Sequence, residues 1–218
     1  MKRADWIAAE WPAPKSVVAG TTLRGTRIED LDLPGRLCWL EQVHGTNIVP
    51  ATDYTTPPQA DGSFSKDPLH ACVVRTADCL PVLLCTDDGA AVAAVHAGWR
   101  GLAAGVIENA VAALGAREKQ VMAWLGPAIS QASFEVGAEV RDAFLDHDPG
   151  ADSCFEPNSR GRWQADLYGL ARQRLAALSI MRVYGGGFCT RQDSQRFDSY
   201  RRNPECGRIV SFIALPGA

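Results

Sequence analysis

The chain has 218 residues, a formal net charge of −3 and a pI near 5.8; 46% of its residues are hydrophobic and 22% are charged. This composition is typical of a globular enzyme. It lacks the basic field that binding to nucleic acid or to an anionic membrane requires, so we expect neither partner. No repeat or Pro/Gly/Ser-rich linker divides the chain. We therefore interpret residues 1–218 as one domain, acting as a monomer or a weak homodimer.

The N-terminal segment begins with two basic residues, but the acidic side chains of Asp5 and Glu10 come soon after them, so no apolar run of signal-peptide length forms. No later segment reaches the roughly 18 uninterrupted apolar residues of a membrane span. The seven cysteines are an odd number without C-x-x-C pairs, which argues against a disulfide framework and a zinc ribbon. We expect a cytoplasmic protein whose cysteines are mostly reduced and buried.

Apolar and β-branched runs predict strands at residues 36–43, 71–76, 81–86, 90–96, 121–126, 181–185 and 208–215. Helical apolar spacing predicts helices at 101–115, ending at Gly115, and at 165–179, capped by Asp166. A weaker third helix is predicted within 133–147, opened by Ser133. Several strands are joined by short turns, which favours an α+β fold with a mixed sheet over a doubly wound parallel one. Prolines interrupt segment 51–63, a loop suited to covering a substrate.

Cys79 lies just before one predicted strand, and His96 closes the next. Only Asp-Asp-Gly at 87–89 separates these strands, and this composition predicts a β-hairpin. With the turn centred there, the numbers of opposite residues sum to about 176 or 177, so His96 faces Leu80 or Pro81. Cys79 then lies within one or two positions of His96, and the two side chains are able to converge on a common atom.

Two more features adjoin this hairpin end. After His96, the predicted helix begins near Gly101, so its free N–H groups and Arg100 offer an anion-binding arrangement. His44 ends another predicted strand, just before a glycine turn. Cys79, His96 and His44 together would have the ligand number of a catalytic zinc site with an open fourth position, and they also suit copper. Spacing alone leaves open a buried structural thiol and hydrogen-bonded structural histidines.

Further candidates each have a structural alternative. Arg75, Arg201 and Arg202 are candidates for the anion, or for surface ion pairs. Asp78 is a candidate to orient a histidine or a bound water, or a turn residue. The glycines at 185–187 permit a close backbone approach to a substrate, or simply form a turn.

Several motifs match one known family in order. "QVHGTNIV", "ADGSFS", "VVRTADCLPVLL", "VAAVHAGWRGLAAGVI", "WLGPAIS" with "FEVG", and "SYRRNPECGRIVSFIAL" resemble the blocks of the YfiH-type or laccase-domain family, also called the polyphenol oxidase family. The similarity runs from about residue 38 to the C-terminus, and the "TADC" and "HAGWRG" blocks are highly specific. Asp198 departs from the pattern, which has a second aromatic there; this puts in doubt a stacking surface at that point.

The resemblance implies a zinc site with His44, Cys79 and His96 as ligands. It also implies a four-layered α/β/β/α sandwich like that of a bacterial deamidating toxin. Family members resemble purine nucleoside phosphorylases that split adenosine, inosine and methylthioadenosine with phosphate and also deaminate adenosine. Zinc with an open position lowers the pKa of bound water, which suits deamination. Phosphorolysis requires instead an anion site, for which Arg75, Arg100 and Asp78 are the expected contacts.

Three alternatives remain open from the sequence. The family name suggests a copper polyphenol oxidase, but the chain has only four histidines and no H-x-H pairs, so a laccase of the usual kind is not expected. A cysteine-type amide hydrolase would use Cys79 as nucleophile and His96 as base, without a metal. A non-catalytic binding protein would keep the metal for stability alone.

Overall fold

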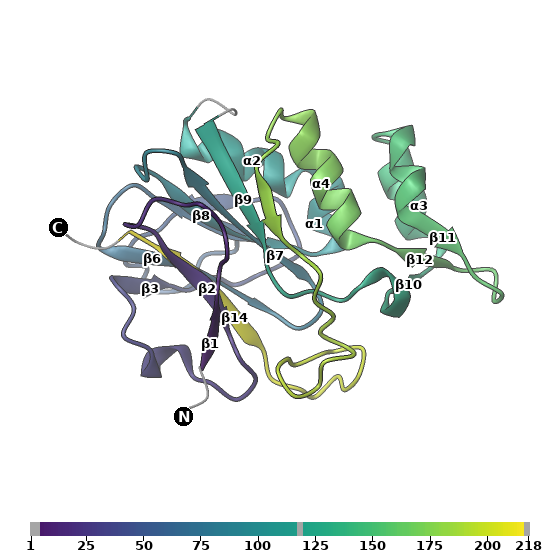
Figure 1. Ribbon diagram of the computed structural model, residues 1–218, viewed down its shortest axis with the longest axis horizontal. Coiled ribbons are helices and arrows are strands. Elements are labelled where there is room, and N and C mark those ends of the chain that lie inside the picture. The colour runs from purple at the N-terminus through teal and green to yellow at the C-terminus, as the bar shows by residue number, and fades with distance from the viewer. Residues whose placement is uncertain (1–4, 117–119, 216–218) are drawn as a thin grey trace.

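The computed structural model describes residues 5–116 and 120–215 (Figure 1). A five-stranded sheet has the order β1 (Trp6–Ala8), β2 (Val18–Thr22), β14 (Ile209–Ala214), β6 (His70–Thr76) and β3 (Arg36–Cys38). A six-stranded sheet has the order β13 (Val183–Gly185), β9 (Val121–Leu125), β7 (Leu80–Thr86), β8 (Val92–Ala97), β5 (Gly62–Ser65) and β4 (Ile48–Pro50). A small sheet joins β10 (Glu135–Val136), β12 (Trp163–Ala165) and β11 (Phe155–Pro157).

The helices are α1 (Trp99–Ala104), α2 (Val106–Leu114), α3 (Ala138–Leu145) and α4 (Leu167–Ala177), with 3-10 turns at Ile28–Asp30, Gln131–Ser133 and Pro149–Cys154. Both large sheets mix parallel and antiparallel pairs; β3 runs parallel to β6 and β13 parallel to β9, while β7 and β8 are antiparallel. The predicted α+β class with mixed sheets is confirmed.

Three apolar clusters define the layers. Helices α1, α2 and α4 cover one face of the six-stranded sheet, where residues such as Leu84 and Val95 are buried against them. The opposite face of that sheet packs on the five-stranded sheet through residues such as Leu83 and Val74. Among the described residues, the 3-10 turn with Ile28 covers the outer face of the five-stranded sheet, and no α-helix packs there. The expected fourth, helical layer is therefore wrong, and the order is α/β/β.

The β7–β8 hairpin is the centre of the six-stranded sheet. Every residue of both strands is buried, because helices cover one face and the second sheet covers the other. The register pairs Pro81 with His96 and Leu80 with Ala97, so opposite numbers sum to 177, as one of the two predicted registers requires. The prediction of a hairpin that brings Cys79 close to His96 is confirmed.

The helical predictions need three corrections. The segment 101–115 is two helices rather than one, because Gly105 has a φ of 98°, a left-handed conformation that ends α1 before α2 begins. The weaker helix starts after Gly137 rather than at Ser133, which lies in a 3-10 turn. Asp166 does hold the N-cap position of α4, but its side chain makes no capping hydrogen bond. The end at Gly115 is confirmed.

The strand predictions differ mainly at short edges. The run at 36–43 is a strand only to Cys38, and β1, β2, β4 and β5 lie outside the predicted runs. These strands have five residues or fewer, too short for a clear alternation of apolar and polar side chains.

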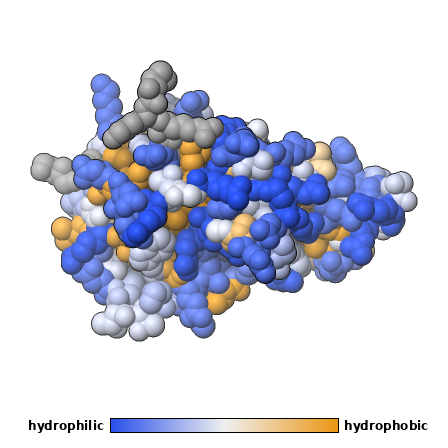
Figure 2. All heavy atoms as spheres, turned by 90° about the horizontal axis from the view of Figure 1, so that it is seen from below, coloured by the Kyte–Doolittle hydropathy of each residue, from blue (hydrophilic) through white to orange (hydrophobic). Residues whose placement is uncertain are grey.

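The surface seen from below is mainly hydrophilic, with small hydrophobic areas separated by polar side chains (Figure 2). Among the described residues, no helix is both long and apolar enough to cross a bilayer.

Candidate functional site

Three predicted residues meet at one end of the central hairpin. One ligand atom each from His44, Cys79 and His96 lies within 4.8 Å of the others, and the two imidazole rings meet edge to face at 4.8 Å between centroids. His96 is buried, Cys79 is half-buried and His44 is exposed. The group is therefore open to solvent on one side only.

The parity of the hairpin register explains why Cys79 and His96 share a face. Side chains alternate along a strand, and directly opposite residues point to the same side. In β8, Val92 and Ala94 face the second sheet, so His96 does too. In β7, Leu83 and Cys85 face that same side. Cys79, immediately before the strand, continues this series.

His44 reaches the group from an irregular loop rather than from a strand end, which corrects the sequence interpretation. Strand β3 ends six positions earlier, and His44 has a φ of 59°. The neighbouring Gly98 is required for the approach, because a Cβ atom there would lie 2.8 Å from Nδ1 of His44 and 3.3 Å from Sγ of Cys79. The glycine of "HAGWRG" thus makes room for the two outer members of the group.

The carboxylate of Asp61, which sequence reasoning did not single out, holds the histidines together. One oxygen accepts hydrogen bonds from the backbone N–H of His44 at 3.0 Å and contacts Nδ1 of His96 at 2.7 Å. The other accepts from the N–H groups of Val43 at 3.2 Å and Gly45 at 2.6 Å. Successive N–H groups converge on an anion when one residue adopts a left-handed conformation, which accounts for the φ of His44. Asp61 is fully buried.

The surroundings of the two histidines shift their pKa values in opposite directions. Burial alone would lower the pKa of His96, but its hydrogen bonds to Asp61 and to the sulfur of Cys79 outweigh burial and raise that pKa to about 9. His44 is exposed at the surface but partly enclosed by its neighbours, and this partial loss of hydration, together with the charges of His96 and Arg100, lowers its pKa. Burial opposes ionisation of Asp61, yet the hydrogen bond from His96 and those from the loop give a net lowering of its pKa.

The group opens into a cavity of about 840 Å³. This volume lies toward the upper end of the roughly 300–1,000 Å³ typical of small-molecule sites. Trp99, Phe134 and Tyr200 form its aromatic lining. Its charged lining consists of two carboxylates and four arginines: Glu41, Asp78, Arg75, Arg100, Arg201 and Arg208.

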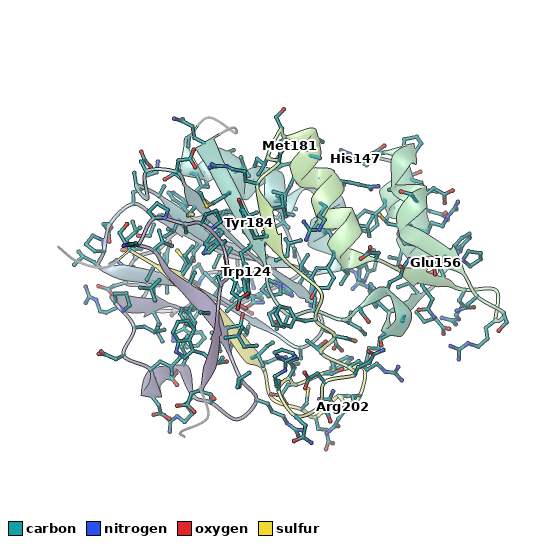
Figure 3. The ribbon with its side chains drawn as sticks, viewed as in Figure 1. Trp124, His147, Glu156, Met181, Tyr184 and Arg202 are labelled. Atoms are coloured by element: carbon teal, nitrogen blue, oxygen red, sulfur yellow. The ribbon has the colours of Figure 1, made fainter. Side chains whose placement is uncertain are left out.

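The lining separates the four arginine candidates. Arg75, Arg100 and Arg201 line the cavity, whereas Arg202 does not. Its guanidinium instead donates to the carbonyl oxygens of Thr190, Arg191 and Phe197 at 2.6–2.9 Å, within the segment between β13 and β14 (Figure 3). Arg202 therefore holds that segment in shape. Helix α1 begins at Trp99, two residues before the predicted start at Gly101, so Arg100 lies in its first turn.

Asp78 is a loop anchor rather than an orienting carboxylate for a histidine. Its two oxygens accept hydrogen bonds from the hydroxyl of Thr190 at 2.6 Å and from the N–H of Arg201 at 2.7 Å. Asp61 takes the orienting position instead. Asp198 pairs with Arg24 at 3.3 Å, outside the cavity lining. The glycines at 185–187 all have positive φ and lie outside the lining, so they bring no backbone close to a substrate in this cavity; Gly185 ends β13, and the other two follow it in irregular backbone.

The other two histidines are remote from the group. His70 lies at the start of β6, with Asp53 at 3.3 Å. His147 follows α3, at the edge of a smaller cavity (Figure 3). Within residues 5–116 and 120–215, the only cluster of three or more His, Cys, Asp or Glu suited to a metal is His44, Cys79 and His96.

Residues 19–216 match the family described as multi-copper polyphenol oxidoreductase laccase. The chain belongs to this family. Purine nucleoside phosphorylases from Pseudomonas aeruginosa and Escherichia coli strain K12, the latter called YfiH, are 44% and 40% identical to it. Both alignments cover 96% of this chain and 98% of the relative. A crystal structure of a Neisseria meningitidis protein superposes with a TM-score of 0.91 at 41% identity, covering 98% of this chain and 100% of that one.

The donor set of this laccase-type family member fits one metal ion. Two imidazoles and one thiolate are the ligand number of an open catalytic zinc site, and the same donors suit copper. Asp61 binds the second ring nitrogen of His96, an arrangement that commonly orients metal-binding histidines. The several H-x-H pairs of a multi-copper centre are not present in this sequence.

Asp61→Asn should weaken metal binding without unfolding the protein. The amide oxygen is still able to accept from His44 and His96, but the NH₂ group cannot accept from Val43 and Gly45. The loop that presents His44 should loosen, and metal affinity should fall roughly ten- to hundredfold. Zinc titration against a competing chelator measures this. Asp53→Asn, which alters the aspartate beside His70, is the matched control. Equal affinities for all three proteins would contradict the role of Asp61.

The metal-free protein should lose stability as the pH rises from about 6.5 to about 9. The ordinary pKa of histidine is 6.5, and the fold raises that of His96 to about 9. Protonated His96 therefore contributes its full stabilisation below pH 6.5, and this contribution is lost as the pH rises through about 9. Urea unfolding of chelator-treated protein across this range measures the slope. His96→Gln should remove this part of the slope; an unchanged slope in that variant would rule His96 out as its source.

Proposed function

We propose that this protein is a zinc-dependent purine nucleoside phosphorylase acting on adenosine, inosine and S-methyl-5′-thioadenosine in the cytoplasm, with adenosine deaminase as a second activity. The observation that carries the proposal is the combination of the His44/Cys79/His96 group and an arginine-lined cavity. It occurs in a chain 40–44% identical, over nearly its full length, to proteins named purine nucleoside phosphorylase.

We assign the metal to His44, Cys79 and His96, with Asp61 fixing the orientation of two of them. When bound there, Zn²⁺ supplies a Lewis acid that polarises an oxygen or lowers the pKa of a water. The buried imidazole of His96, the half-buried sulfur of Cys79 and the exposed imidazole of His44 all line the cavity. A metal held by them would therefore face a substrate bound there.

We assign the attacking phosphate to Arg100, with Cys79 and His96 as the adjoining catalytic groups. The guanidinium of Arg100 stacks 4.4 Å from the ring centroid of Trp99 and is close enough to His44 to influence its pKa. A planar, permanently charged guanidinium suits two-point contact with a phosphate. Arg75 is a second contact for an anionic substrate group, and Asp78 contributes by anchoring the segment that carries Arg201.

The two activities require different positions of one purine. In phosphorolysis a phosphate oxygen bonds to C1′ of the ribose while the bond from C1′ to N9 breaks, and the base leaves with the electron pair. In deamination water adds at C6 of adenine and ammonia leaves. The aromatic rings of Trp99, Phe134 and Tyr200 line the cavity and offer faces on which a purine can stack.

Zinc-loaded protein incubated with adenosine and phosphate should yield adenine and ribose 1-phosphate, with a smaller amount of inosine and ammonia. Chromatography of the bases, with a separate ammonia assay, resolves the two reactions. Omitting phosphate should abolish adenine formation and leave inosine formation intact. Full zinc occupancy with neither product formed would contradict the proposed function.

His44→Ala separates this proposal from a cysteine hydrolase. The contact between Cys79 and His96 that raises the pKa of His96 is also the contact that a cysteine nucleophile and its histidine base would form. The resemblance to a deamidating toxin would favour amide hydrolysis by such a pair. A metal enzyme should lose at least about a hundredfold in nucleoside turnover without its third ligand. A Cys/His pair would retain activity and form a covalent adduct on Cys79. Reconstitution with copper in place of zinc tests the oxidase implied by the family name.

A further inference from the structure

The arginines of the cavity lack carboxylate partners in the part of the chain that the structure describes. No ion pair there involves Arg75, Arg100, Arg201 or Arg208, although arginines elsewhere, such as Arg36, are paired. Of the two carboxylates in the lining, that of Asp78 already accepts two hydrogen bonds from the protein. A chain with a net charge of −3 thus gathers uncompensated positive charge in one cavity. Such a cavity attracts an anionic ligand.

These arginines fall into separate groups on the fold. Arg100 belongs to α1, beside the metal-ligand candidates. Arg75 lies on β6 and Arg208 immediately precedes β14, its antiparallel neighbour. Because Val210 pairs with Arg75, continuing the register by two residues places Arg208 diagonally across from Arg75 on the same face of the sheet. Diagonal neighbours are about 7–8 Å apart, within reach of long side chains.

Both guanidinium groups are held in place with donors to spare. Arg75 stacks 5.5 Å from the ring centroid of Trp39 and donates one hydrogen bond to the carbonyl of Leu40 at 3.2 Å. Arg208 donates through a single nitrogen to the carbonyls of Cys206 and Gly207, at 2.9 Å each. A guanidinium has five N–H donors, so each side chain keeps several for a ligand.

We propose that Arg75 and Arg208 form a second anion subsite that receives the 5′-phosphate of a purine nucleoside 5′-monophosphate. This inference rests on the proposed function, because the attacking phosphate is assigned to Arg100. The ribose separates C1′, where that phosphate attacks, from the 5′ oxygen, so a nucleotide substrate requires two anion sites one sugar apart. A cavity of about 840 Å³ has room for both phosphates and the base.

The reaction balances with inorganic phosphate as the only co-reactant. The bond between N9 of the purine and C1′ breaks, and a bond forms between C1′ and a phosphate oxygen. The base takes the electron pair and the proton of the hydrogen phosphate ion. The products are the free purine and ribose 1,5-bisphosphate.

The test compares adenosine with adenosine 5′-monophosphate on zinc-loaded enzyme at fixed phosphate. The wild-type protein should prefer the monophosphate by tenfold or more in kcat/KM. Arg208→Gln and Arg75→Gln should each reduce this preference roughly ten- to hundredfold, the effect of losing a charge-assisted hydrogen bond. Calorimetric binding of the monophosphate without inorganic phosphate should weaken by a similar factor. Arg162→Gln, which replaces an exposed arginine outside the lining, is the matched control and should retain both values.

The other outcomes are equally decisive. If both variants raise KM for inorganic phosphate with adenosine and leave the substrate preference unchanged, the pair holds the attacking phosphate and the proposal is overturned. Unchanged binding of the monophosphate in both variants overturns it as well. If the pair binds the monophosphate but neither substrate is turned over, the anion subsite stands and the phosphorylase assignment fails.

Discussion

The carboxylate of Asp61 is the interaction on which the candidate site depends. It is fully buried, and it ties the irregular loop of His44 to the ring of His96 through four contacts of 2.6–3.2 Å. A buried carboxylate without such partners would be costly, so the loop and the ring must stay in place for the charge to be tolerated. The same contacts aim the free nitrogen of His96 toward Cys79. One residue outside the proposed ligand set therefore fixes two of its members.

The rest of the fold supplies a rigid base for this arrangement. The β7–β8 hairpin is buried on both faces, between the helices and the second sheet, so Cys79 and His96 are presented by strands that are packed on both sides. The cavity side is different in character. Arginines from α1, from one end of the five-stranded sheet and from the segment between β13 and β14 meet there without carboxylate partners in the described chain. A metal-ligand group and several arginines lining one cavity suit a substrate with an anionic component.

Local sequence was sufficient to predict the hairpin, because a short Asp/Gly turn fixes the register and the register fixes which side chains share a face. It was insufficient for His44, whose loop has no periodic pattern and is shaped by a carboxylate 17 positions further along the chain. The sequence resemblance, rather than spacing, joined His44 to the other two. The break at Gly105 depends on a backbone conformation that apolar spacing does not report. Arg208 was missed because its neighbour across the sheet, Arg75, is more than a hundred residues away in the chain.

The most direct test of this account is to locate the metal in zinc-loaded protein by anomalous diffraction at the zinc edge. One strong peak per chain is expected, bounded by the sulfur of Cys79 and by one imidazole nitrogen each from His44 and His96, with Asp61 still in contact with the far side of the His96 ring. A peak at His70 or His147, or one that lacks the sulfur or the imidazole of His44, would contradict it.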